Sequence, residues 1–289
     1  MELTISGTPI QTKDFEWEVG FNMAGNRGTL DGLPDGMNVM YVTDVQYAGA
    51  QAASFSGGDF MAIAGTEWKR NEAGQLILDK NGMPTYTNSL SAVGNRESTF
   101  TGGLNNTLTW KGFTFNMLWE FRVGGDVING TAYAMNNVGV SAQSAKWRNE
   151  PLTVSGVDAD GNPVSHTWEA NKTYMFNGVE KSGYNIIQDY YTTYYPKETK
   201  NYITDVNSLR LRSVSLSYSV PQNFLKKIGF VKRASLSVAA TNLLLITNYD
   251  GDPEVAAAGA GVGGSSSVGF DYCGVPATSS MSFGLNLTF

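Results

Sequence analysis

Apolar and polar residues alternate one by one in seven segments of the chain. The clearest case is residues 113–123, and the last case is residues 281–289. A period of two places the apolar side chains on one face of a β-strand and the polar ones on the other. The sequence therefore predicts seven two-faced strands. In the two clearest strands the apolar face carries Phe113, Phe115, Met117, Trp119, Phe121, Met281, Phe283, Leu285 and Leu287.

The other five segments follow the same rule with small irregularities. They are residues 2–6, 15–23, 100–110, 209–220 and 234–240. The apolar phase slips by one position near Arg212 and Ser213, which predicts a β-bulge there. Residues 221–228, PQNFLKKI, predict one or two helical turns between the fifth and sixth strands.

The connections between these strands alternate in length. Short connections of a few residues alternate with long ones, at about 25–97, 124–205 and 245–278. A compact soluble domain seldom contains three loops of this length, whereas an outer-membrane barrel has short turns on one side and long loops on the other. We therefore predict that the apolar face meets lipid and the polar face lines a wet lumen. The alternative is a soluble β-rich extracellular glycan-binding or adhesion module, in which the apolar face packs into a core.

Composition supports β-structure and excludes some partners. Charged residues are 16% of the chain, below the roughly 25% that is usual for soluble domains, and glycine and aromatic residues are abundant. The net charge of −6 argues against a nucleic-acid partner, because phosphate binding needs clustered Lys and Arg. The longest uninterrupted aliphatic run has four residues, so no transmembrane helix is expected. The first residues lack the pattern of a signal peptide.

Candidate catalytic and metal-binding chemistry is sparse. The single histidine, His166, lies in a polar stretch without a hydrolase or metalloprotease motif, so we expect an exposed loop residue. Asp158, Asp160, Asn162 and Glu169 match part of a calcium-loop pattern, but Pro163 occupies the position that needs glycine. A hairpin turn is favoured there. Asp250, Asp252 and Glu254 could also bind Ca²⁺, and that question stays open. We assign no catalytic residue, no metal site and no cofactor.

Tyrosines concentrate in one part of the second long loop, between Tyr184 and Tyr202. Exposed aromatic side chains there could stack on sugar rings or contact a protein lid. They could equally pack the loop against its neighbours, which is the favoured alternative. The candidates for ligand or lid contact are Tyr190, Tyr191, Tyr194 and Tyr195.

Several motifs resemble one known family. The stretch SLRLRSVSLSYSVPQNFLKKIGFVKRASLSVAATNLLLITNYDGDPEV, followed by SFGLNLTF, is similar to the closing section of SusC/RagA-like TonB-dependent outer-membrane transporters. The stretches GNRESTFTGGLNNTLTWKGFTFNMLWEFRVGGDVINGT and ELTISGTPIQTKDFEWEVGFNMAGNR resemble paired strands of the same family. The resemblance covers nearly the whole chain, apart from divergent long loops.

The resemblance implies a fold and a set of partners. Residues 1–289 would form the C-terminal portion of a 22-stranded transmembrane β-barrel, all-β, with about seven antiparallel strands and long extracellular loops. The plug domain and signal peptide would be missing from this stretch. The implied function is import of oligosaccharides or peptides, with a SusD-like surface lipoprotein as lid and TonB acting through the missing N-terminal part.

The same resemblance implies a location and an assembly signal. The protein would lie in the outer membrane lipid of a Gram-negative cell with its C-terminus in the periplasm. Phe289 would be part of the signal that the outer-membrane assembly machinery recognises. Because seven strands cannot close such a barrel, two unpaired edges would face lipid. We therefore expect that this segment alone aggregates and does not transport.

Overall fold

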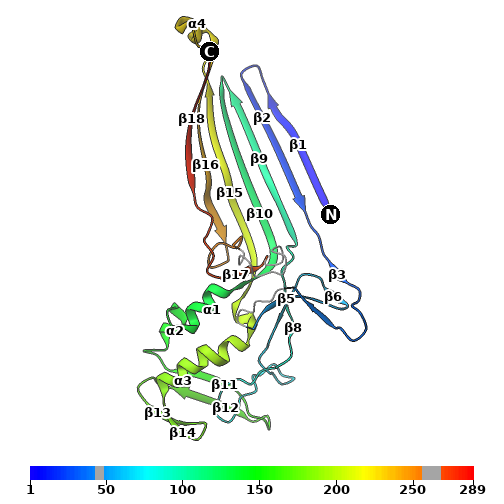
Figure 1. Cartoon of the computed structure of the whole chain (residues 1–289), viewed down its shortest axis with the longest axis vertical. Coiled ribbons are helices and arrows are strands. Elements are labelled where there is room, and N and C mark those ends of the chain that lie inside the picture. The colour runs from blue at the N-terminus through cyan, green and yellow to red at the C-terminus, as the bar shows by residue number, and fades with distance from the viewer. Residues whose placement is uncertain (43–48, 256–267) are drawn as a thin grey trace.

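Seven long strands form one antiparallel sheet, which we call the wall (Figure 1). The computed structural model describes residues 1–42, 49–255 and 268–289. The predicted strands are confirmed, and several are longer than expected. The strands in spatial order are β1 (Glu2–Gln11), β2 (Phe15–Ala24), β9 (Phe100–Trp110), β10 (Phe113–Asn129), β15 (Ile203–Ser219), β16 (Arg233–Thr247) and β18 (Ser280–Thr288).

The register of the wall brings the apolar residues of neighbouring strands into line. Phe115 lies opposite Leu108 of β9 on one side and Leu216 of β15 on the other. Leu216 in turn pairs with Val238, which pairs with Phe283. Polar residues form parallel rows, and in one of them Thr107 Oγ1 donates to Asn116 Oδ1 at 2.9 Å. Since one face is mainly apolar across the strands, a one-residue slip would move apolar side chains to the polar side.

Short connections join the strands at one end of the wall. Between β9 and β10, Lys111 and Gly112 have φ angles of 48° and 89°, as a two-residue type I′ turn requires. Between β15 and β16 lies the predicted helical segment, α4 (Gln222–Ile228), which ends at Gly229 with φ 84°. A glycine in this left-handed region is the usual end of a helix.

Long connections leave the other end and fold into what we call the lobe. These connections carry short strands and helices of their own. The first contains β3 (Thr29–Leu30), β4 (Val39–Tyr41), β5 (Gln51–Phe55), β6 (Gly58–Asp59), β7 (Ala62–Gly65) and β8 (Ser91–Asn95). The second contains α1 (Gly130–Asn137), α2 (Ala142–Lys146), β11 (Leu152–Val157), β12 (Pro163–Trp168), β13 (Thr173–Phe176), β14 (Val179–Ser182), α3 (Gly183–Asp189), a π-helix (Tyr190–Tyr194) and two 3-10 helices (Tyr195–Lys197, Thr199–Tyr202). The third contains β17 (Phe270–Asp271), which pairs in parallel with β10.

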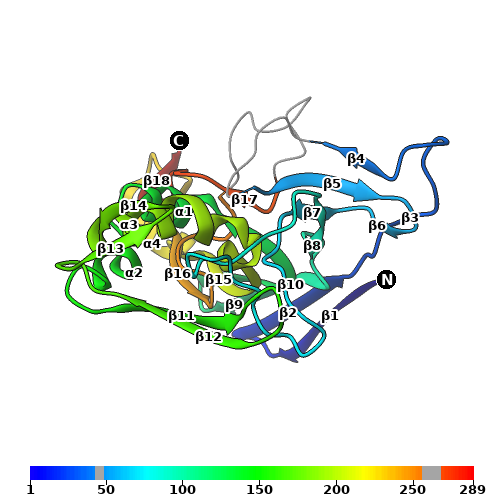
Figure 2. The same ribbon diagram turned by 90° about the horizontal axis from the view of Figure 1, so that it is seen from below.

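The lobe has a buried core that combines the loops. One cluster joins Leu78 and Met83 of the first loop to Trp168 and Ile186 of the second. Another joins Ile63 to residues of the second and third loops. Seen from the lobe end in Figure 2, the strands β3–β8 lie on one side and β11–β14 on the other. No helix within the described ranges is long and apolar enough to cross a membrane.

Candidate functional site

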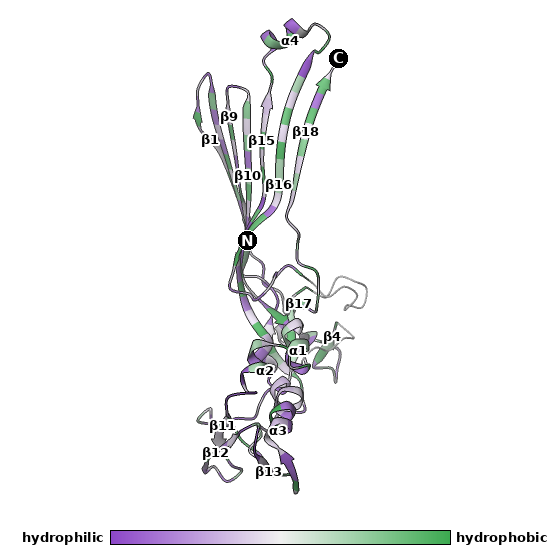
Figure 3. Ribbon diagram, turned by 90° about the vertical axis from the view of Figure 1, so that its left-hand side faces the viewer, coloured by the Kyte–Doolittle hydropathy of each residue, from purple (hydrophilic) through white to green (hydrophobic). Residues whose placement is uncertain are grey.

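The predicted lipid-facing residues all lie on the apolar face of the wall, where the described structure places no second layer over them. Phe283 is 81% exposed and Leu285 62% exposed, while Phe115, Met117, Trp119 and Phe121 are half-buried by their neighbours on adjacent strands. Figure 3 shows the alternation as green and purple bands along β16 and β18. A soluble sandwich would cover such a face with another sheet. Contact with lipid remains a prediction.

One polar side chain interrupts the apolar face. Asn106 aligns with Val19 and Met117 on the neighbouring strands and is 9% exposed. Its Oδ1 accepts a hydrogen bond from the indole N–H of Trp17 at 3.3 Å. A buried amide is tolerated when a partner satisfies it, so the indole accounts for an asparagine that weakens the alternation in β9.

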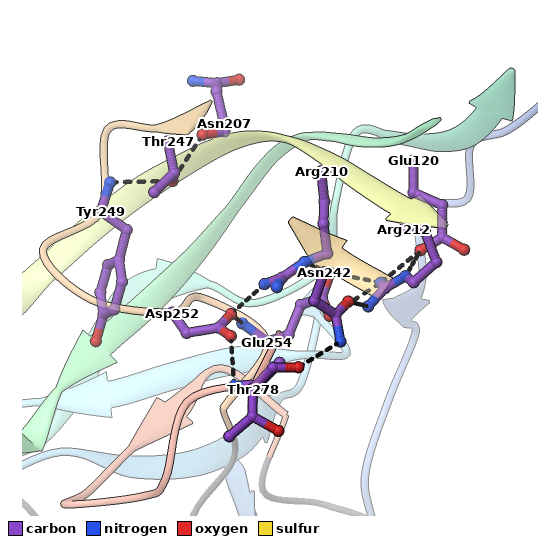
Figure 4. Close-up of polar contacts among 11 residues, drawn as sticks. Glu120, Asn207, Arg210, Arg212, Asn242, Thr247, Tyr249, Asp252, Glu254 and Thr278 are labelled. Carbon is purple, nitrogen blue, oxygen red and sulfur yellow. Dashed lines mark hydrogen bonds and ion pairs between the residues drawn. The ribbon is translucent and has the colours of Figure 1, made fainter. Parts of the chain in front are cut away.

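The polar face carries a charged cluster at its lobe end (Figure 4). We define this cluster as Glu120, Arg210, Arg212, Asp252 and Glu254. Arg212 Nε donates to Glu120 Oε2 at 2.7 Å, and its terminal nitrogen donates to both oxygens of Glu254, at 2.8 and 3.0 Å. Arg210, only 3% exposed, donates to Asp252 and to Glu254. The cluster thus ties two strands of the wall, β10 and β15, to the segment 249–255.

The predicted bulge is confirmed and orients this cluster. The pairing of β15 with both neighbours shifts between Leu211 and Ser213, around Arg212. On the opposing strand, Asn242 has φ 51°, and its side-chain N–H donates to Thr278 O at 3.3 Å. Because an extra residue in a strand re-aims its neighbours, Arg210 and Arg212 can both reach the carboxylates of the cluster.

Asp252 is held as a carboxylate by its partners. Burial raises its pKa, but backbone N–H groups of Ala277 and Glu254, at 3.0 and 3.1 Å, and the Arg210 guanidinium outweigh burial. The net effect is that the pKa of Asp252 lies below its ordinary value. The oxygens of Asp252 and Glu254 therefore serve arginines and backbone amides. No group of three or more potential metal ligands occurs among the described residues.

Sequence reasoning missed the charged cluster, although two signals could have found it. Arg210 lies on the polar face, and Arg212 lies in the bulge beside it, so both arginines come close together. The acidic motif after β16 is the nearest source of countercharge along the chain. Buried opposite charges are expected to pair. The sequence could therefore have predicted that these arginines form ion pairs, but it could not have identified which carboxylates they bind.

A groove of about 550 Å³ opens beside the cluster on the polar face. Glu120, Glu254 and Arg122 contribute charged side chains, and Asn22, Thr101 and Ser208 contribute polar ones. Gly102, Gly103, Leu118 and Phe121 also line the groove. This mixture of charge, amide and hydroxyl groups suits a hydrated polar solute.

The tyrosines of the second loop do not form one exposed surface. Tyr190 and Tyr191 are 8% and 5% exposed and pack edge to face, with ring centres 5.2 Å apart. Burial raises the pKa of both phenols. Tyr194 and Tyr195 are half-buried; Trp68 donates to the carbonyl of Tyr194, and Gln143 donates to the hydroxyl of Tyr195. The first two rings thus pack the loop, and contact with a ligand or lid stays a prediction.

The structure differs from the sequence-based expectation at His166 and agrees with it at Asp158. His166 is not an exposed loop residue, because it lies half-buried in β12 and stacks on Trp168 with ring centres 5.9 Å apart. Asp158 closes a hairpin turn, as favoured, since its Oδ1 accepts from the backbone N–H groups of Asp160 and Asn162 at 2.9 Å. Phe289 stacks on Phe230 with ring centres 6.1 Å apart.

Comparisons with known proteins agree with the resemblance seen in the sequence. No family model matches the chain. TonB-dependent receptor P3 of Formosa agariphila is 25% identical over 311 residues, covering all of this chain and 28% of that receptor. TonB-dependent receptor P39 of the same organism is 25% identical over 217 residues, covering 74% of this chain and 18% of that receptor. The chain therefore spans less than a third of the length of these relatives.

Solved structures share the fold. The RagAB peptide transporter aligns over the whole chain and 29% of its own length, with a TM-score of 0.61 and 19% identity. The RagAB peptide importer in its open-open state gives a TM-score of 0.61 with 17% identity, over 28% of its length. The wall and lobe thus have the architecture of part of a RagA-like barrel, in agreement with the resemblance of the sequence to SusC/RagA-like TonB-dependent transporters.

Proposed function

We propose that this chain forms part of the barrel wall and extracellular loops of an outer-membrane importer of large nutrients. The observation that carries the proposal is the register of the wall, which keeps one face apolar and bare across seven strands. Short turns at one end and long structured loops at the other support the periplasmic and extracellular sides, respectively. The named receptors and transporters to which the chain is similar support import rather than catalysis.

The substrate class and the partners are part of the same proposal. We propose that oligosaccharides or peptides enter past the lobe and along the polar groove beside the charged cluster. A SusD-like lipoprotein would cover the lobe, and TonB would act through a plug outside this segment. RagAB is a peptide transporter by name, which supports a peptide as one of the two substrate classes.

The remaining sequence-based assignments also enter as proposals. Residues 1–289 would be a C-terminal barrel portion, with the nine apolar residues of β10 and β18 named above in contact with lipid. Phe289 would serve as an assembly signal. β1 and β18 each have one neighbour within the described sheet, so the segment alone would expose two strand edges in the membrane and would not transport.

The experiment that tests the function is growth of a deletion strain on defined nutrients. The strain lacks the receptor that carries this segment, and its sole carbon or nitrogen source is drawn from a panel of oligosaccharides and oligopeptides. We expect loss of growth on one class, restored by the intact receptor but not in a strain without TonB. Unchanged growth on every member of the panel would overturn the proposal.

A second measurement separates barrel assembly from import. Outer membranes from the complemented strain are run on a heat-modifiability gel, which reports a folded barrel by its altered mobility. A receptor that assembles without restoring growth would leave the barrel proposal intact and refute the nutrient proposal. A receptor that does not assemble would refute both.

A further inference from the structure

Positive charge is concentrated at the short-turn end of the wall. The three short connections, together with the first residue of β16, carry six of the 20 Lys and Arg residues but only one of the 26 Asp and Glu residues. All three connections lie at the same end of the sheet, opposite the lobe (Figure 1). The basic residues are Lys13, Lys111, Lys226, Lys227, Lys232 and Arg233, and the acidic one is Asp14. In a chain with a net charge of −6, this end is strongly cationic.

Most of these cations are not neutralised by neighbouring side chains. Within residues 1–42, 49–255 and 268–289, no ion pair involves Lys111, Lys226 or Lys227. Lys226 and Lys227 are exposed on α4. Lys232 differs, because its Nζ donates to the carbonyl oxygen of Phe289 at 3.0 Å. Three lysines at this end are thus available to an anion.

The apolar face is hollowed next to this cationic end. A groove of about 430 Å³ runs over β10, β15, β16 and β18. Its side chains are almost entirely apolar, with Val238 lying between larger neighbours on the adjacent strands. Leu236 and Phe283 in this groove are 54% and 81% exposed. The lining side chains on the apolar face are Phe113, Leu216, Tyr218, Leu236, Val238, Phe283 and Leu285.

A chain of aromatic contacts connects the groove to the cations. The Tyr218 ring of the groove lies 4.4 Å from Phe113, which lies 6.4 Å from Trp110. Lys111 Nζ lies 5.6 Å from the centre of the Trp110 ring. After Tyr218, β15 ends and the chain enters α4 at Gln222. This helix carries Lys226 and Lys227 at the same end of the wall. An acyl chain in the groove would therefore have its headgroup among lysines and aromatic rings.

We propose that this groove binds an anionic glycerophospholipid of the leaflet at the short-turn end. One acyl chain lies in the apolar groove, and the phosphate lies near Lys111, Lys226 and Lys227. Clusters of basic side chains beside a hydrophobic membrane surface favour anionic headgroups, and aromatic rings favour the interface. The inference rests on the proposed function in one respect, namely that the apolar face meets lipid.

The test uses the intact receptor that carries this segment, purified in detergent. Native mass spectrometry measures binding of phosphatidylglycerol and of phosphatidylcholine, which share acyl chains and differ in net charge. Lys226→Gln with Lys227→Gln removes headgroup contacts, and Lys69→Gln with Lys80→Gln in the lobe is the charge-matched control. Val238→Phe fills the groove, and Leu244→Phe, on the apolar face of the same strand, is its matched control.

We expect tighter binding of phosphatidylglycerol than of phosphatidylcholine. The double lysine variant should weaken the binding of phosphatidylglycerol about 25-fold, because each basic residue near a membrane surface contributes about fivefold to the affinity for an anionic lipid. Val238→Phe should weaken both lipids, and neither control should change either. Equal affinity for the two lipids would overturn the proposal, as would a Val238→Phe variant that binds like wild type or a polypeptide found bound in place of lipid.

Heat-modifiability of each variant keeps this outcome separate from the proposed function. A receptor that assembles and shows no preference for the anionic lipid refutes the lipid site alone. A wild-type receptor that does not insert into membranes refutes the barrel function and the lipid site together.

Discussion

The wall and the lobe bury their apolar side chains in different ways. In the wall, apolar residues line one face of a single sheet, and many remain exposed, such as Phe283 at 81%. In the lobe, Phe270, Ile63 and Met83 are fully buried in clusters built from different loops. The lobe thus carries its own hydrophobic core, as a water-soluble domain does, while many apolar side chains of the wall are left exposed.

This difference fits the proposal that one chain meets two solvents, with lipid at the wall and water at the lobe. The wall satisfies its backbone through strand pairing, which a membrane requires because lipid offers no hydrogen bonds. In the proposed orientation the lobe would meet water, and its backbone also uses turns, caps and side-chain hydrogen bonds. Its loops therefore fold by packing on one another, and their structure depends on contacts between residues far apart in sequence, such as the bridge between Ile77 and Val157.

The sharpest test of the comparison exchanges the same residue type in both regions. Phe270→Ala in the lobe should lower the free energy of unfolding by about 3–5 kcal/mol, because it removes buried area and leaves a cavity. Phe283→Ala in the wall should cost less, about 1.5–3 kcal/mol, because lipid fills the space left by the ring. Guanidinium unfolding of the intact receptor in vesicles measures both. Equal costs would contradict the assignment of Phe283 to lipid.

The second test places a charge on each face of one strand. Met117→Arg should destabilise the receptor by about 2–4 kcal/mol, as expected for arginine at the lipid-facing midplane of a barrel. Asn116→Arg, the matched control on the polar face, should cost less, about 1 kcal/mol, as expected for loss of the hydrogen bond from Thr107. Vesicle unfolding and the yield of heat-modifiable barrel report the effect. A larger loss of stability for Asn116→Arg than for Met117→Arg would contradict the assignment of Met117 to the lipid-facing side.

The third test concerns the junction between wall and lobe. The folded-state pKa of Asp252 lies below its ordinary value. A depressed pKa contributes stability above the unfolded-state value, and this contribution is lost as the pH falls through the folded-state value. We expect hydrogen exchange of residues 249–255 to rise as the pH falls below about 4, and Asp252→Asn to abolish that dependence. An unchanged dependence in the variant would assign it to another group.

The smallest expected effect lies at the start of the second loop. Asn129 Oδ1 accepts from the N–H of Ala132 at 2.7 Å and caps α1. Asn129→Ala should lower local stability by about 1 kcal/mol, and Asn129→Asp should retain most of it. Hydrogen exchange in α1 reads out the difference while β10 serves as the internal reference. If α1 is equally protected from hydrogen exchange in Asn129→Ala and in Asn129→Asp, the Asn129 side chain does not stabilise the helix as a cap.

The wall was predictable because its information is local. Alternation in Phe113–Val123 fixes the faces of β10, and the phase slip at Arg212 marks the bulge without knowledge of its neighbours. The lobe was not predictable in this way, since short strands such as β7 have no periodic pattern and pair through distant residues. The charged cluster shows the same limit: Arg210 is readable as polar-facing, but its partner Asp252 comes from a loop 42 residues away.

Where the wall passes into the lobe, β10 bends at two glycines. Gly124 and Gly125 have φ angles of 72° and 88°, and Arg122 donates to both of their carbonyl oxygens, at 3.1 and 2.7 Å. Asn207 Oδ1 accepts from the N–H of Gly124 at 3.3 Å. These hydrogen bonds fix the backbone conformation of the bend, so it does not act as a hinge. Folding has already ordered the residues of this bend. Binding of a solute at the lobe would therefore cost little further conformational entropy there, because the surface is preorganised.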